Sequence, residues 1–390
     1  MLKFLDDLVR RDDHNIEALE CTLTTACNLG CSYCHQGEHH PCVMSWTVLK
    51  AAIERLHVSA GEELTLALTG GEPLLEWPLV RRAIEYVHES SSNGKPVAIS
   101  LTSNGLLLDQ EKARFLVEHD VEVQISLDGI REAHELRAPG TFDALEGLFK
   151  GMRRDHPSWY RKRLAVGMVL TSANVGFLAK SIEMLLGWGI ERIRLGPLLT
   201  HDEGWGRKAE AELKRQMQAV FECCQEHHQR TGAIPLEVFR RPATPPEAKP
   251  DRPVCRVNAP ETQAIGIDGG VTGCPLLLAP EVGGTHAGPM LQEWVTRPDW
   301  PGLRRDRYSR FAQCRDCDFV EECLVCPVAS ANIPGNTDFR RVPDFNCAFN
   351  RIVAACRRRF PPLPGPADIL KGNDPLPTAM TDLARALGMA

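Results

Sequence analysis

Three cysteines lie close together near the start of the chain, in the run Cys-Asn-Leu-Gly-Cys-Ser-Tyr-Cys. Cys27, Cys31 and Cys34 are separated by three and then two residues. Because thiolates are the usual protein ligands of iron-sulfur clusters, three thiols on one loop would leave one iron of a [4Fe-4S] cluster open to a small molecule. The same triad could also be a zinc site with one ligand elsewhere, or three unrelated buried thiols.

The chain has 390 residues and 15 cysteines, and these are clustered. Five lie between residues 21 and 42, two are the neighbours Cys223 and Cys224, and eight lie between residues 255 and 356. In a reducing cytosol, metal binding or catalysis explains such a number better than disulfides do. The distribution predicts two metal-bearing regions.

Composition narrows the class of protein and its partners. Hydrophobic residues make up 43% of the chain, charged residues 25%, and the net charge is -6. These values are ordinary for a globular protein and give no general attraction to nucleic acid or anionic lipid. The first residues lack a signal-peptide core, and no apolar run has membrane-spanning length. We therefore expect a cytoplasmic protein with no nucleic-acid and no membrane partner.

Short β-rich runs alternate with helical runs between residues 20 and 200, which predicts an α/β fold of parallel βα units. Amphipathic runs at 47–58, 110–119 and 175–188 predict helices, the last two beginning after the N-cap residues Asp109 and Asn174. Six strands make a partial (β/α)6 TIM-like barrel, whose chemistry should gather at the carboxyl ends of the strands. The predicted strands are 20–24, 64–69, 97–102, 121–127, 164–171 and 192–198.

Composition also predicts the domain boundaries. The partial barrel occupies 1–205, and 206–253 is a bridging region. This bridge is a helix at 206–231 that ends at Gly232, followed by a Pro-rich linker at 242–253. Residues 254–360 are rich in cysteine and turn residues, as expected of a small α+β domain in which metal sites replace hydrophobic core. Residues 361–390 are predicted to be a tail.

Polar motifs follow the second, third and fourth predicted strands. They are Gly-Gly-Glu-Pro-Leu-Leu at 70–75, Thr-Ser-Asn-Gly at 102–105 and Ile-Ser-Leu-Asp-Gly at 125–129, with His-Glu-Leu-Arg following at 134–137. A Gly-Gly pair lets backbone approach a ligand closely. Glu72 adds an acceptor suited to an ammonium group, and Arg137 a bidentate donor suited to a carboxylate.

Together with the cysteine triad, these motifs resemble the radical S-adenosylmethionine (SAM) family. The resemblance implies that the amino and carboxylate groups of SAM chelate the open iron. Tyr33 would shield the cluster or contact the adenine, although simple packing is an equal alternative, and an exposed helix charge is the alternative for Arg137. The residues implied to bind SAM are Tyr33, Gly70, Gly71, Glu72, Ser103, Asn104, Ser126, Asp128 and Arg137.

The cysteines after the linker resemble the SPASM domain, which carries two auxiliary [4Fe-4S] clusters and would bring the total to three. The resemblance assigns one cluster to Cys314, Cys317, Cys323 and Cys347, and the other to Cys255, Cys274 and Cys326. Two residues precede Cys326 where the family usually has three. The second set lacks a fourth ligand, which could be Glu261, another residue, water or the substrate. The alternative is a zinc ribbon, because paired Cys-x2-Cys segments bind zinc readily.

The resemblance also implies an activity. An electron donor such as flavodoxin or ferredoxin would reduce the first cluster, and SAM would be cleaved to methionine and a 5'-deoxyadenosyl radical that abstracts hydrogen from substrate. Because SPASM relatives mostly modify peptides, we expect an oxidoreductase that installs a crosslink, thioether or epimerised residue in a ribosomally made precursor peptide. The sequence identifies no catalytic base.

Three other functions remain open. An anaerobic sulfatase-maturating, formylglycine-forming enzyme would carry an aspartate where Pro275 follows Cys274, and a glutamine is also missing before the 102–105 motif. A radical SAM dehydrogenase on a small molecule is a further possibility. A non-enzymatic zinc or cluster-binding interaction protein would not need the strand-end motifs.

The remaining reactive residues are expected to be structural. They are Cys21, Cys42, Cys223, Cys224 and Cys356, with His39, His40, His227 and His228 expected on solvated surfaces. The first predicted strand begins near residue 20, which leaves no room before it for a leader-binding domain. A leader peptide would then bind the barrel or the bridging helix, or be presented by a separate leader-binding protein.

Overall fold

The computed structural model describes residues 16–34, 41–59, 61, 64–91, 95–198, 202–241, 261–278, 314, 316–319, 323 and 344–362. Cys255, Cys326, His39, His40, the Pro-rich linker and all but two residues of the predicted tail lie outside this range.

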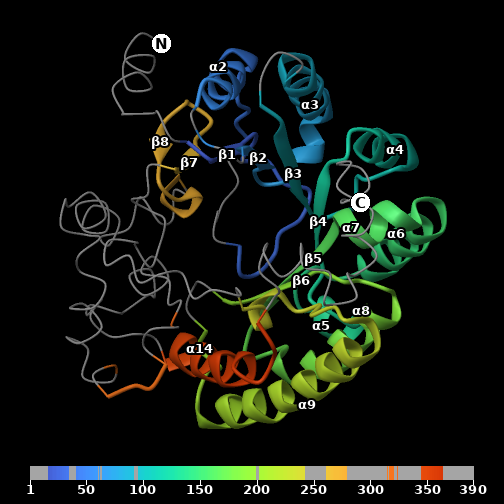
Figure 1. Cartoon of the computed structure of the whole chain (residues 1–390), viewed down its shortest axis with the longest axis vertical. Coiled ribbons are helices and arrows are strands. Elements are labelled where there is room, and N and C mark those ends of the chain that lie inside the picture. Colours follow the sequence, from blue (N-terminus) through green and yellow to red (C-terminus); the bar gives the residue numbers. More distant parts are fainter. Residues whose placement is uncertain are drawn as a thin grey trace, which may run out of the picture.

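A parallel sheet of six strands forms the centre of the molecule and confirms the predicted α/β partial barrel (Figure 1). Neighbouring strands follow the order of the sequence, and all six run in the same direction. The strands are β1 (Ala18–Thr22), β2 (Leu64–Thr69), β3 (Val97–Ser103), β4 (Glu122–Ser126), β5 (Leu164–Leu170) and β6 (Ile193–Pro197).

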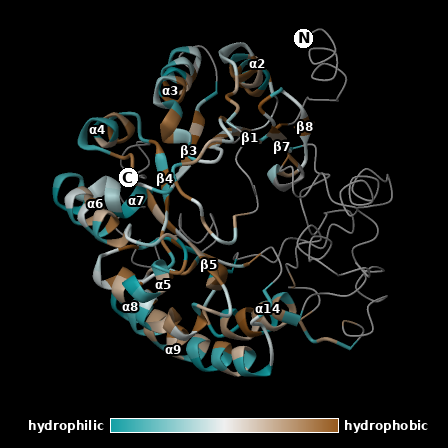
Figure 2. Cartoon of the chain, turned by 180° about the vertical axis from the view of Figure 1, so that it is seen from behind, coloured by the Kyte–Doolittle hydropathy of each residue, from teal (hydrophilic) through white to brown (hydrophobic). Residues whose placement is uncertain are grey.

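Helices cover the outer face of this sheet, where alternate strand residues such as Leu66, Leu101 and Ile125 are fully buried. Figure 2 shows hydrophilic residues on the outward faces of α6, α8 and α9. The helices are α2 (Trp46–His57), α3 (Trp77–Ser91), α4 (Gln110–Glu118), α5 (Arg131–His134), α6 (Phe142–Asp155), α7 (Pro157–Arg163), α8 (Leu178–Gly187) and α9 (Arg207–Thr231), with 3-10 turns η1 (Pro73–Glu76) and η2 (Val175–Phe177).

Two predicted helix boundaries are confirmed, the beginning of α4 after Asp109 and the end of α9 at Gly232. The α-helix predicted to begin directly after Asn174 begins later. Asp109 accepts a hydrogen bond from the Lys112 N–H at 2.9 Å, as an N-cap should, and α9 ends at Gly232 with a left-handed φ of 75°. Asn174 makes no cap bond to the helix. Its side chain bonds to Thr171 N and Val169 O instead, so it closes the turn after β5, and η2 precedes α8.

The part of the chain beyond residue 205 covers both edges of the six-stranded sheet. Strand β7 (Thr262–Ile265) pairs in parallel with β1, and β8 (Val271–Thr272) pairs antiparallel with β7 (Figure 1). At the other edge, Ile193 of β6 forms a parallel bridge to Leu236, just before η3 (Glu237–Phe239). Open sheet edges expose unpaired backbone groups. Residues 261–272 therefore belong to the barrel's own sheet, although they were predicted to lie in a separate domain.

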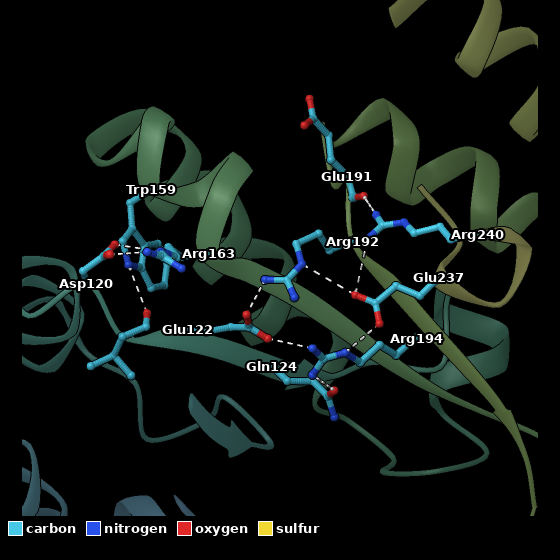
Figure 3. A network of polar contacts seen from close by, with 11 residues as sticks. Asp120, Glu122, Gln124, Trp159, Arg163, Glu191, Arg192, Arg194, Glu237 and Arg240 are labelled. Atoms are coloured by element: carbon cyan, nitrogen blue, oxygen red, sulfur yellow. Dashed lines mark hydrogen bonds and ion pairs between the residues drawn. The ribbon is translucent and has the colours of Figure 1, made fainter. Parts of the chain in front are cut away.

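An ion-pair network holds the β6 edge at the end of the sheet where the strands begin (Figure 3). Arg194 contacts Glu122 at 2.7 Å and Glu237 at 3.0 Å, and Arg192 reaches Glu237 at 3.6 Å. Burial opposes ionisation of Glu122, but the charges and hydrogen bonds of the two arginines outweigh it and lower its pKa. The network thus ties β4, β6 and η3 together opposite the strand-end motifs.

Helix α14 (Asp344–Arg357) brings the C-terminal region onto α9. Phe360 lies against Phe221 and Phe239, with ring centroids 5.1 and 5.4 Å away. His227 on α9 is only 7% exposed and neither of its ring nitrogens has a partner among the described residues. The expectation that His227 lies on a solvated surface is therefore wrong, because α9 is covered along the face that carries it.

Candidate functional site

A cavity of about 400 Å³ lies at the carboxyl ends of the parallel strands. Ten of the residues predicted from the sequence line it, including all three cysteines of the N-terminal triad. These ten are Cys27, Cys31, Tyr33, Cys34, Gly70, Gly71, Ser103, Asn104, Ser126 and Arg137. Glu72 and Asp128 do not line it, being 0% and 3% exposed.

The cysteine loop, residues 27–34, leaves β1 from a base that is closed by hydrogen bonds. Thr25 N bonds to Cys42 O at 3.0 Å, and Cys42 N returns a bond to Thr25 Oγ1 at 2.9 Å. Within the loop, Cys34 N bonds to Cys31 O at 3.1 Å, which forms a Cys-x2-Cys turn. The Cys42 backbone thus closes the base of the loop, while its side chain is exposed.

The two glycines after β2 pack directly on this base. A Cβ on Gly71 would lie 2.3 Å from Ala26 O, and one on Gly70 would lie 2.5 Å from Thr24 O. Gly71 N and Glu72 N donate to Thr24 O and Ala26 O at 2.7 and 2.8 Å. Close backbone contact with the loop base thus requires glycine here, in addition to any contact with a ligand in the cavity.

Glu72 is buried beneath the cavity, where its carboxylate accepts three hydrogen bonds. The donors are Leu74 N at 3.0 Å, Ser103 Oγ at 2.8 Å and Asn104 N at 2.7 Å. Burial raises the pKa of this carboxyl, and the three hydrogen bonds act in the opposite direction. Glu72 therefore joins the end of β2 to the end of β3.

Asn104 extends this connection to the cysteine loop. Its Nδ2 donates to Asn28 Oδ1 at 2.8 Å and lies 3.9 Å from Cys27 Sγ, while its Oδ1 accepts from Leu106 N at 3.0 Å. Both ends of the Asn104 amide thus have protein partners.

Asp128, after β4, holds the other end of the loop. Its carboxylate accepts hydrogen bonds from the Tyr33 hydroxyl, from Val169 N at 2.9 Å and from Arg137 Nη1 at 3.2 Å. Burial disfavours the charge on Arg137, but the negative charges of Asp128, Tyr33 and Cys31 together with the hydrogen bond to Asp128 outweigh it and raise the Arg137 pKa. Arg137 lies 5.6 Å from the Tyr33 ring centroid, and its Nε is buried without a described partner. Arg137 is therefore not an exposed helix charge.

His134 contacts the backbone of Asp128. Its Nδ1 accepts from Asp128 N at 3.3 Å and its Nε2 lies 3.0 Å from Thr141 Oγ1. Burial, reinforced by the nearby charge of Arg137, lowers the pKa of His134 to about 4. The neutral imidazole is thus the form that fits this position.

The three cavity cysteines suit a cationic cluster. Burial raises the pKa of the Cys27 thiol, and the negative charges of Glu72, Cys31 and Cys34 add to this rise against one backbone hydrogen bond. Positive iron at the centre of the loop would stabilise the thiolates that repel one another in its absence.

Sequence reasoning missed the part of the cavity that β5 and β6 supply. Val169 on β5, and Gly196, Pro197 and Leu198 at the end of β6, line the cavity opposite the cysteines. They carry no polar motif, so only their position at the carboxyl ends of strands could have indicated them. Leu29, Thr69 and Thr102 complete the lining.

Four cysteines of the C-terminal region form a second group. The charges of Cys347, Cys323 and Cys317 each add to burial in raising the pKa of Cys314 to about 11. Cys317 N bonds to Cys314 O at 3.2 Å, the same turn as in the N-terminal loop. Arg358, which follows α14, donates to Asp318 O at 2.8 Å and so links the two segments that carry these cysteines.

Of the three cysteines predicted to hold the other cluster, Cys274 alone lies within the described part of the chain. Cys274 follows β8, and Thr272 Oγ1 donates to its carbonyl at 2.8 Å. Among the described residues, no three His, Cys, Asp or Glu side chains are placed to hold a single metal ion. Cys21 and Cys224 are fully buried and Cys356 is 7% exposed, as expected of structural thiols.

One family description matches part of the chain: residues 21–155 match the radical SAM superfamily. Within the described residues, no helix is long and apolar enough to cross a membrane.

Two curated relatives match parts of the chain. A cysteine-type anaerobic sulfatase-maturating enzyme of Clostridium perfringens is 31% identical over 29% of this chain and 33% of its own length. A probable GTP 3',8-cyclase of Sulfurisphaera tokodaii is 28% identical over 51% of this chain and 61% of its own. The match thus covers less than two thirds of these curated relatives.

Two solved structures share the fold over most of the chain. Native anSMEcpe with bound AdoMet and Cp18Cys peptide has a TM-score of 0.65 at 16% identity, covering 88% of this chain and 97% of that one. Streptococcus suis SuiB bound to precursor peptide SuiA has a TM-score of 0.59 at 16% identity, covering 89% and 79%. At this identity the likeness concerns the fold.

Proposed function

Residues 21–155 form a radical SAM domain, and from this premise we propose that the chain cleaves SAM reductively and uses the resulting radical to modify a ribosomally made peptide. The observation that carries the proposal is the common cavity. Three thiols, two glycines and the Arg137 guanidinium line the same space at the strand ends.

Cys27, Cys31 and Cys34 would hold a [4Fe-4S] cluster with one open iron. When bound there, such a cluster would supply the electron that reductive cleavage of SAM to methionine and a 5'-deoxyadenosyl radical requires. The chain's own residues would bind and orient SAM and the substrate, and would keep water out of the cavity.

Arg137 would bind the SAM carboxylate. Its side chain lines the cavity, is held by Asp128 and lies by the Tyr33 ring, and its buried Nε has no partner among the described residues. A guanidinium fixed in this way suits a carboxylate. Ser126 would offer its hydroxyl to the ribose from the end of β4, whereas the Ser103 hydroxyl is bonded to Glu72 and Gly105 N. The apolar wall of Val169, Pro197 and Leu198 would receive the substrate.

The C-terminal cysteines would hold two auxiliary clusters, one on Cys314, Cys317, Cys323 and Cys347 and the other on Cys255, Cys274 and Cys326. The turn that joins Cys314 to Cys317, and the bond from Arg358 to Asp318 O that ties this segment to the helix of Cys347, support the first assignment. An electron donor such as flavodoxin or ferredoxin would reduce the protein, and a separate protein could present the leader peptide.

A peptide substrate is supported by the two solved structures of this fold that hold peptides. A formylglycine-forming activity is the second candidate, favoured by the 31% identity to a sulfatase-maturating enzyme. Pro275 stands where that family has its aspartate base, which favours the first candidate.

The experiment is anaerobic turnover of the reconstituted protein with SAM, reductant and candidate peptides from open reading frames beside the gene, followed by mass spectrometry. A loss of two mass units, or another defined change, in a short precursor peptide supports the proposal. Conversion of a sulfatase Ser or Cys to formylglycine would instead establish the second candidate.

A further inference from the structure

Glu72 and Asn104 occupy positions where the family resemblance implies contact with SAM, but their side-chain polar atoms have protein partners. The Glu72 carboxylate is 0% exposed and accepts three hydrogen bonds. Asn104 uses its Nδ2 on Asn28 and Cys27 and its Oδ1 on Leu106 N. The Glu72 side chain does not line the cavity, so a contact with SAM would require the residues that cover it to move.

We propose that Glu72 and Asn104 are a positioning pair, in which Glu72 fixes Asn104 so that the Asn104 amide orients Cys27 and donates a hydrogen bond to its sulfur. This inference rests on the proposed function, because the sulfur in question would be a cluster ligand.

The connection from Glu72 to Cys27 is continuous. Glu72 Oε2 accepts from Asn104 N at 2.7 Å, and Asn104 Nδ2 lies 3.9 Å from Cys27 Sγ. The second bond of Nδ2, to Asn28 at 2.8 Å, fixes the residue next to Cys27. Asn104 is 8% exposed, so little water competes for its amide.

A hydrogen bond to a ligand sulfur favours the reduced, more electron-rich cluster. In Asn104→Ala this bond is absent, so at a fixed potential the ratio of reduced to oxidised cluster should fall about threefold to tenfold, or about 30 to 60 mV for one electron.

Glu72→Gln tests the first step of the connection. An amide offers one oxygen and one NH2 group, whereas all three partners of Glu72 are donors. Either orientation of Gln therefore sets an NH2 against a backbone N–H, of Asn104 or of Leu74. Because the substitution also removes a negative charge that acts on Cys27, its effect on the connection is measured by alkylation of Cys27 and not by the potential. Glu76→Gln is the matched control, because Glu76 lies four residues further on and does not line the cavity.

The experiment is an EPR-monitored redox titration without SAM, with SAM affinity measured separately by equilibrium dialysis. A lower potential in Asn104→Ala, but not in Glu76→Gln, supports the pair. An unchanged potential with SAM binding weakened tenfold or more would overturn it, as would no change in either quantity.

Cysteine alkylation of the cluster-free chain tests the same pair when a variant does not load its cluster. Asn104→Ala and Glu72→Gln, but not Glu76→Gln, should each raise the alkylation rate of Cys27 at least about threefold, because the loop opens more often, with Cys223 on α9 unchanged. An unchanged Cys27 rate would overturn the inference. Absence of any cluster in the wild-type chain would overturn the proposed function, while the alkylation result would still decide on the pair.

Discussion

The two cysteine regions are positioned by different means. Side chains from the strand ends hold the N-terminal loop: Asn104 contacts Asn28 and Asp128 accepts from Tyr33. In the C-terminal group, Cys347 lies on α14, a helix that packs on α9, and Arg358 connects this helix to the segment beside Cys317. Substitutions in the loop should therefore mainly lower SAM cleavage. Substitutions in the C-terminal group should lower the iron content and weaken the packing of α14 on α9.

Exchange of one cysteine in each region should give the largest contrast. Cys31→Ala should reduce 5'-deoxyadenosine formation below about one-thousandth of wild type, since a cluster with two thiolates at this site cannot present SAM. Cys347→Ala should keep SAM cleavage while iron falls from about twelve to about eight per chain. Iron analysis and chromatography of the products measure both. Loss of SAM cleavage in Cys347→Ala would remove the contrast.

Substitutions of Asp128 and Arg137 test how the cysteine loop is held at the end that carries Tyr33. Arg137→Ala should weaken SAM binding about 10- to 100-fold, through loss of a carboxylate partner. Asp128→Asn leaves the Arg137 charge buried without its partner and should lower the free energy of unfolding by about 3 kcal/mol.

Arg131→Ala is the matched control for this pair. Arg131 contacts Asp143 through an exposed ion pair, 48% and 74% exposed, so its loss should leave the free energy of unfolding nearly unchanged. Equilibrium dialysis with SAM and urea denaturation distinguish the variants. Equal effects of Arg131→Ala and Arg137→Ala would contradict a specific role for Arg137.

Substitution of Gly71, which packs on the base of the loop, should have a smaller and purely steric effect on stability. Gly71→Ala places a Cβ 2.3 Å from Ala26 O and should destabilise the chain by about 1 to 3 kcal/mol. Gly147→Ala on α6 meets nothing within 4 Å and should be stabilising by about 0.5 kcal/mol. Urea denaturation of the two variants checks the difference, and a Gly71→Ala variant as stable as wild type would contradict the close packing.

A pH effect should arise at His134, which supports Asp128. The pKa of His134 is lowered to about 4, so the unfolded chain takes up a proton below about pH 6.5 that the folded chain does not. Stability should thus fall on acidification from pH 6.5 to 5.5, by at most about 1.4 kcal/mol for this pH unit. The fall should be smaller in His134→Gln. An equal fall in both proteins, measured by urea denaturation, would exclude His134 as its source.

Much of the fold is predictable from the sequence, because the spacing of hydrophobic residues and the positions of helix-ending and turn residues agree with the observed elements. β2 spans the predicted 64–69, and Gly232 ends α9 through a left-handed φ that glycine adopts readily. What the sequence could not give are long-range pairings. Nothing local indicates that 262–265 pairs with β1, because a parallel partner is chosen by the whole sheet.

The same limit applies to the site. The spacing of Cys27, Cys31 and Cys34 identified the loop, and the motifs identified most of the lining of the cavity. The direction of each side chain was not predictable, so Glu72 and Asp128 were expected in the cavity but lie beneath it. Val169 and Leu198 have apolar side chains that motif reasoning does not select.

Reductive cleavage of SAM by the anaerobically reconstituted chain, with Cys27→Ala as comparison, tests the central claim most directly. The wild-type chain should produce 5'-deoxyadenosine and methionine with dithionite as electron source, and Cys27→Ala should produce neither above the protein-free background. Equal product from the two proteins would contradict the assignment of the cysteine loop as the seat of the cluster that cleaves SAM.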